Sequence, residues 1–224
     1  MNPQMIEYIE QQFAELKNPT EAVRQVAYMR DKFKFLGIKK PLIKNVMVEL
    51  LRQFKPSLEE TVVLADSLYY KEYREYQYLA LYLLEKSAKK LNESHLPMLE
   101  AMTLHDSWWD SVDSISSNII GMILLKLSPA QRKPYLTKWE NTNNLWLLRT
   151  CIIFQMKYKK DTDLEYLAYI CEKLKYHEDF FIRKAIGWAL REYSKTDYAW
   201  VENFVAKNQD LSNLSKKEAL RITS

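Results

Sequence analysis

The chain is poor in glycine: three of its 224 residues are glycine, at positions 37, 121 and 187. Hairpin turns, barrel corners and phosphate-cradling loops depend on glycine at positive φ. The shortage therefore argues against an all-β fold and leaves no P-loop or dinucleotide-binding fingerprint. The abundance of Leu, Lys, Glu, Ala, Gln and Arg favours an all-α protein instead.

Cysteine and histidine are also scarce. The two cysteines, Cys151 and Cys171, lie in apolar helical patterns, so we expect buried free thiols in a reducing compartment. Two distant cysteines and three scattered histidines build no metal-ligand cluster, and no metal is expected. No run of about 18 apolar residues and no charged-then-apolar leader is present, so we expect a cytoplasmic protein that does not enter the membrane.

The net charge is +4 and the pI is about 8.8. This mildly basic balance permits a polyanionic partner without demanding one, because a nucleic-acid-binding protein needs its positive charge gathered on one face.

Apolar residues recur at helical spacing almost throughout, with helix starts at Pro19, Pro41 and Ser57. Ser57 and Glu60 form the sequence pattern of a capping box. Four later segments place an aromatic residue early in an apolar helix, and aligning these aromatics gives spacings of 33, 37 and 35 residues: Tyr76, Trp109, Trp146 and Phe181. A period in the thirties made of two helices predicts a curved solenoid of HEAT-like antiparallel helix pairs with a concave face. We expect one domain over residues 1–224 and a monomer.

The segment from Asp106 to Asp113 holds two tryptophans and three aspartates. On a helix, Trp109 and Asp113 stand at i and i+4 on one face, and an aromatic face beside a carboxylate suits a cation. The simpler interpretation is a core tryptophan next to a solvated aspartate. We expect Asp113 to be the functional carboxylate and Asp106 to be a cap. Asp110 is expected to be a surface charge and Trp108 to be structural.

A second constellation lies further along the chain. Gly187 sits inside a helical pattern, where close helix packing or a ligand would explain it. Equivalent positions of a solenoid line one surface, so one concave face is expected to carry Trp109, Asp113, Arg149, Trp188 and Arg191. The same face is expected to carry cations that would suit a polyanionic partner: Arg149, Lys157, Lys159, Lys160, Arg183, Lys184, Arg191 and Lys195.

Four segments carry a family resemblance: Phe33–Ile38, Ser107–Asp113, Leu147–Lys159 and Phe181–Tyr193. They resemble the DNA alkylation repair family, the AlkD-like DNA glycosylases of HEAT-like repeats, over roughly residues 5 to 205. The resemblance implies an enzyme that removes N3- and N7-alkylated purines from duplex DNA without a flipped-base pocket or a cofactor. It also implies site roles. The active-site tryptophans would be Trp109 and Trp188, the catalytic carboxylate Asp113, and the DNA-binding residues Arg149, Arg191, Lys157 and Tyr28.

The chemistry suits these residue types. An alkylated purine is a cationic leaving group, and its departure leaves a sugar with oxocarbenium character. An ionised Asp113 supplies the counter-charge, and we expect Arg149 or Arg191 to keep its pKa low. Two alternatives stay open. One is a non-catalytic helical-repeat module that binds nucleic acid or protein through the same face. The other is an unrelated hydrolase with Asp106, Asp110 and Asp113 as metal ligands.

Overall fold

The computed structural model describes residues 2–221, and every regular element in that range is helical. An isolated bridge between Lys34 and Tyr73 is the sole β-type pairing among them. The all-α prediction is therefore confirmed. The chain divides into two compact units, Met1–Leu91 and Asn92–Ser224, which are described separately below. The solenoid with one concave face and the single domain stay predictions.

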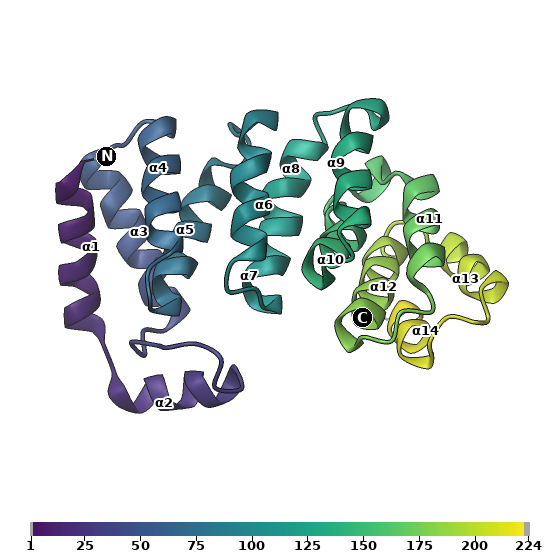
Figure 1. The fold of residues 1–224 in the computed structure, drawn as a ribbon, viewed down its shortest axis with the longest axis horizontal. Helices are drawn as coiled ribbons and strands as arrows, with labels where there is room; N and C mark the ends of the chain where they lie inside the picture. Colours follow the sequence, from purple (N-terminus) through teal and green to yellow (C-terminus); the bar gives the residue numbers. More distant parts are fainter. Residues whose placement is uncertain (1, 222–224) are drawn as a thin grey trace. The chain divides into compact units, whose positions relative to one another are not determined.

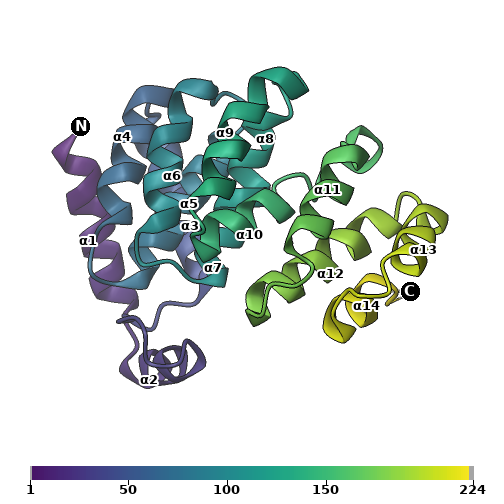
Figure 2. The same cartoon turned by 45° about the vertical axis from the view of Figure 1, so that its right-hand side comes forward.

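The helices are shown in Figures 1 and 2. The first unit holds α1 (Pro3–Leu16), α2 (Pro19–Tyr28), α3 (Lys40–Phe54), α4 (Leu58–Tyr69) and α5 (Arg74–Ser87). The second unit holds η1 (Glu93–His95), α6 (Leu96–Leu104), α7 (Trp109–Ser114), the π-helical η2 (Ile115–Ile120), α8 (Gly121–Leu124), α9 (Pro129–Asn141), α10 (Leu145–Ile153), η3 (Lys159–Asp161), α11 (Leu164–Leu174), α12 (Phe180–Ser194), α13 (Tyr198–Lys207) and α14 (Asn213–Ala219).

Local sequence signals set the helix starts. Ser57 and Glu60 form both hydrogen bonds of the predicted capping box at α4. Asn18 caps α2, with Pro19 in the first turn as expected. No helix among residues 2–221 has both the length and the apolar character needed to cross a membrane.

In the first unit, the loop between α2 and α3 is pinned by a buried carboxylate. Glu75, at the start of α5, accepts hydrogen bonds from three consecutive backbone amides at Leu36, Gly37 and Ile38, at 2.8–3.1 Å. Burial raises the pKa of Glu75, while these amides lower it. Gly37 has φ +86° and lies so close to Asn18 that a Cβ would come within 1.9 Å of its carbonyl oxygen. The loop is therefore held in one conformation against the first turn of α2.

In the second unit, α7, η2 and α8 follow one another without a break and carry a fully buried stripe, which includes Val112, Ile115, Ile119 and Ile123. Gly121 allows close packing here, because a Cβ would lie 2.2 Å from the carbonyl oxygen of Phe154. Cys151 and Cys171 are free and fully buried, as expected, and burial raises the pKa of both thiols. They are structural side chains.

Candidate active site

The tryptophan–aspartate segment begins a helix two residues later than expected, at Trp109. Trp108 is the extended N-cap residue of α7, so Asp106 is not the cap; it adopts a left-handed conformation with φ 43° in the preceding turn. Asp110 is 8% exposed, so the prediction of a surface charge was wrong. Asp113 lies in the last turn of α7, immediately before the π-helical turn, a feature often found at functional sites.

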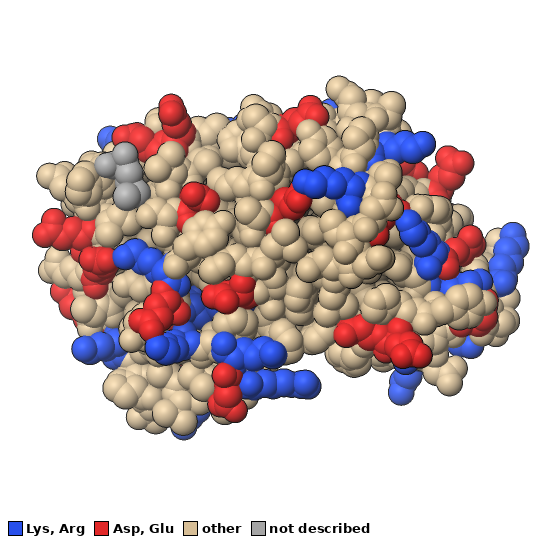
Figure 3. Space-filling view, in the orientation of Figure 1, with Lys and Arg blue, Asp and Glu red and all other residues tan. Residues whose placement is uncertain are grey.

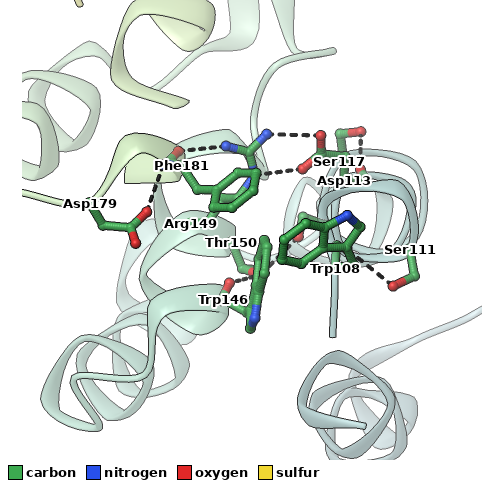
Figure 4. A network of polar contacts seen from close by, with 10 residues as sticks. Trp108, Ser111, Asp113, Ser117, Trp146, Arg149, Thr150, Asp179 and Phe181 are labelled. Atoms are coloured by element: carbon green, nitrogen blue, oxygen red, sulfur yellow. Dashed lines mark hydrogen bonds and ion pairs between the residues drawn. The ribbon is translucent and has the colours of Figure 1, made fainter. Parts of the chain in front are cut away.

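Asp113 is held by a two-point clamp (Figure 4). The Nε of Arg149 donates to Oδ1 of Asp113 at 2.7 Å, and its Nη2 donates to Oδ2 at 2.8 Å. The remaining Nη1 donates to the carbonyl oxygen of Phe181 at 2.6 Å. Arg149 is 3% exposed, so its guanidinium is buried in the protein interior. This bidentate geometry fixes both the position and the orientation of the carboxylate.

The pKa of Asp113 is subject to opposing influences. Burial raises it above its ordinary value, and the hydrogen bonds and charge of Arg149 lower it. The net direction is upward, so the expectation that arginine would keep this pKa low was wrong. The two hydrogen bonds from the buried, always charged Arg149 favour the carboxylate form of Asp113. Asp113 and Arg149 thus form an ion pair.

Asp113 borders a cavity of about 350 Å³. Its lining residues come from the helix that begins at α7, from the turn after α10 and from α12: Asp113, Ser114, Ser117, Asn118, Met156, Lys157, Trp188 and Glu192. The Asp113 side chain is 17% exposed, so it is accessible from this cavity. Three of the predicted site residues, Asp113, Lys157 and Trp188, thus line one cavity, and a fourth, Arg149, is bonded to Asp113. Trp109 is half-buried in the first turn of α7 and is not part of this lining.

Aromatic rings support the clamp from behind. The Arg149 guanidinium carbon lies 5.9 Å from the centre of the Trp188 ring and 6.0 Å from that of Phe181. The Phe181 ring lies 5.1 Å from both Trp108 and Trp146, and Figure 4 shows the three rings gathered beside the clamp. Trp108 therefore packs against both Trp146 and Phe181. The structural role expected of Trp108 agrees with this packing.

Arg191 is directed to a different partner. Its Nη1 donates to Oε2 of Glu218 in α14 at 2.9 Å, and Lys184 donates to Oε1 of the same carboxylate at 2.6 Å. The hydrogen bond from Lys184, followed by the charges of Lys184 and Arg191, lowers the pKa of Glu218. Arg191 therefore does not join Asp113 at the cavity. Tyr28 lies in the other unit, at the end of α2, and is 72% exposed.

Several other predicted DNA-binding cations are also engaged within the protein. Lys195 pairs with Glu192 at 2.6 Å, and Arg183 donates to the carbonyl oxygen of His177 at 2.9 Å. Lys157, Lys159 and Lys160 are exposed. Among residues 2–221, no group of three or more His, Cys, Asp or Glu side chains is arranged to hold a metal ion, so the three aspartates of the Asp106–Asp113 segment do not form one.

A model of the DNA alkylation repair enzyme family matches residues 9–222. The chain belongs to this family. A solved structure described as a predicted DNA alkylation repair enzyme from Enterococcus faecalis is 30% identical, with a TM-score of 0.80, over 93% of this chain and 97% of that one. The structure of smu.31 from Streptococcus mutans UA159 shares the fold at 17% identity, with a TM-score of 0.57, over 83% of this chain and 99% of that one. No curated protein matches the chain.

Membership in the DNA alkylation repair family implies that this chain binds DNA. The structure also contains site residues that the sequence analysis missed. Glu192 is a second carboxylate in the cavity, one helical turn after Trp188, and this i, i+4 spacing is a signal that was available in the sequence. Ser117 donates to the carbonyl oxygen of Asp113 at 2.7 Å and so ties the π-helical turn to the end of α7. No sequence pattern predicted the π-helical turn.

The close packing of α12 against α14 explains why residue 187 is a glycine. A Cβ at this position would lie 2.5 Å from the Cβ of Glu218 and 2.8 Å from the carbonyl oxygen of Ser215, both in α14. We expect Gly187→Ala to push α14 away from α12 and to lower the free energy of unfolding by about 1–3 kcal/mol. Urea denaturation measures this. An alanine that leaves stability unchanged, or raises it by the ordinary helix-propensity gain of about 1 kcal/mol, would contradict the packing argument.

Proposed function

We propose that this protein is a DNA glycosylase that hydrolyses the N-glycosidic bond of cationic N3- and N7-alkylated purines in duplex DNA. The observation that carries the proposal is the Asp113 carboxylate, clamped by Arg149 at the edge of a cavity that also exposes Trp188. A fixed anion beside an aromatic ring is complementary to a positive charge and offers little to an anionic phosphate.

The reaction needs stabilisation of positive charge more than it needs acid catalysis. Alkylation at N3 or N7 already makes the purine a good leaving group, so no proton has to be donated to it. As the C1′–N bond breaks, positive charge develops on the sugar. A preorganised carboxylate stabilises this transition state by about 3–4 kcal/mol, by analogy with the hydrogen-bond donors that stabilise an oxyanion. Trp188 adds about 0.5–2 kcal/mol through its ring. Stabilisation of this size is enough to accelerate the release of a labile cationic base. It is too small to release a normal, neutral base.

Arg149 takes a different role in this proposal from the one that the family resemblance implied. Each of its three nitrogens donates a hydrogen bond to Asp113 or Phe181, and the side chain is buried. A phosphate could reach it only after the clamp had broken. We therefore assign Arg149 as the positioning residue that keeps Asp113 oriented and ionised, and we leave phosphate contacts to exposed cations such as Lys157.

The direct test is release of bases from methylated duplex DNA by the full chain. We expect single-turnover release of 7-methylguanine and 3-methyladenine, leaving abasic sites, with no release of unmodified guanine or adenine. Release is measured by chromatography of the free bases. Tight binding to the same DNA without any release would refute the glycosylase and favour the non-catalytic helical-repeat module.

A further inference from the structure

Glu192 is a second carboxylate in the cavity beside Asp113, and it lines a further cavity as well. It follows Trp188 by one turn of α12, on the same face of the helix. The further cavity has a volume of about 300 Å³, and its lining includes Met156 and Glu192, which also line the first cavity. The Glu192 side chain is 32% exposed. Glu192 is therefore reached from two cavities and is accessible to solvent.

The further cavity is suited to water. Its lining includes the polar side chains of Gln155, Thr162 and Thr196, next to the apolar side chains of Ile152 and Leu167. Water occupies a cavity that offers both room and several polar partners. Hydrolysis of a glycosidic bond consumes one water molecule, so the site has to admit water while DNA occupies it. The cavity that shares Glu192 with the candidate active site provides this access.

The two carboxylate oxygens of Glu192 have different surroundings. Oε2 accepts a hydrogen bond from Nζ of Lys195 at 2.6 Å. Oε1 accepts none from the protein among residues 2–221. In Asp113, by contrast, both oxygens accept hydrogen bonds from Arg149. Lys195 thus orients the Glu192 carboxylate and leaves one oxygen open to accept a proton.

An ion pair with a lysine does not by itself mark a functional carboxylate in this protein. Figure 3 shows Asp and Glu side chains interspersed with Lys and Arg on the face that it draws. Surface pairs of this kind add little to stability. Glu192 is set apart because it lines the same cavity as Asp113 and Trp188 and because its Oε1 is open.

We propose that Glu192 is the general base that accepts a proton from the attacking water, a role that rests on the glycosylase function proposed above. The water oxygen bonds to C1′ as the C1′–N9 bond breaks. The electron pair of that bond returns to the purine ring and cancels its positive charge, so the base leaves neutral. The water loses one proton to Oε1 of Glu192, which passes it to solvent. Asp113 stays on Arg149 and remains the fixed anion that opposes the charge on the sugar.

The test compares Glu192→Gln with the natural protein in single-turnover release of 7-methylguanine at saturating enzyme. The amide keeps the shape of the side chain but cannot accept the proton, so we expect release to fall about 100-fold while Kd for methylated duplex DNA is unchanged. Sodium azide should restore much of the lost rate, because the azide anion bonds to C1′ without releasing a proton. The product is then DNA with an azido sugar, which mass spectrometry identifies. Azide should leave the rate of the natural protein unchanged.

The matched control is Glu202→Gln, the same change at an exposed residue of α13 that lines neither cavity, and its release rate should be normal. Lys195→Gln removes the partner of Oε2 and should cost less than Glu192→Gln. A normal rate in Glu192→Gln would overturn the proposal. Equal losses in Glu192→Gln and Lys195→Gln that azide does not restore would also overturn it, because Glu192 would then only hold Lys195. Absence of release from the natural protein would instead refute the glycosylase function itself, and this role with it.

Discussion

Replacement of Asp113 by Asn is expected to reduce the single-turnover release of 7-methylguanine by about 100- to 1,000-fold. The substitution keeps the size of the side chain and removes the charge that opposes the developing cation, and the loss corresponds to about 3–4 kcal/mol. The variant should still bind methylated duplex DNA, because the exposed cations are untouched. Base release at saturating enzyme, measured beside a binding isotherm, separates the two effects.

Asp110→Asn is the matched control for this substitution. It makes the same chemical change three residues earlier on the same helix, at a buried carboxylate that does not line the cavity. We expect its release rate to stay within about threefold of the natural protein, since Asp110 does not line the cavity and does not face the reacting sugar. If Asp113→Asn retained the full rate, or if both variants lost it equally, Asp113 would not be the catalytic carboxylate.

The sequence predicted the helical class and several helix starts because those depend on local chemistry. The Ser57 capping box and Pro19 act within a few residues of themselves. The i, i+4 spacing from Trp109 singled out Asp113 as a candidate, although only Asp113 of the two lines the cavity.

Side-chain partners could not be predicted in the same way. Whether Arg191 faces the cavity or Glu218 depends on α14, which begins 22 residues later and packs closely only because residue 187 lacks a side chain. The packing of Trp108 against Trp146 has a similar origin. The extended N-cap at Trp108 decides which ring points toward Trp146, and neither tryptophan carries a capping signal.

Replacement of Arg149 by Met is expected to make base release depend on pH. Without the guanidinium, nothing offsets the burial that raises the pKa of Asp113, so the carboxyl holds its proton at neutral pH. Release should be strongly reduced at pH 7 and should recover as the pH rises and Asp113 ionises, whereas the natural protein should show no such rise. The folded chain then binds this proton more tightly than the unfolded chain, so the free energy of unfolding should fall as the pH rises.

Loss of one partner from a buried pair costs about 3–5 kcal/mol, whereas neutralising both partners is often nearly neutral. The double variant Asp113→Asn with Arg149→Met should therefore be more stable than the less stable of the two single variants, yet remain inactive at every pH. This combination separates loss of fold from loss of charge. A pH-independent Arg149→Met enzyme with a normal rate at saturating DNA, but with a raised Kd and a smaller salt slope, would instead identify Arg149 as a phosphate-binding residue.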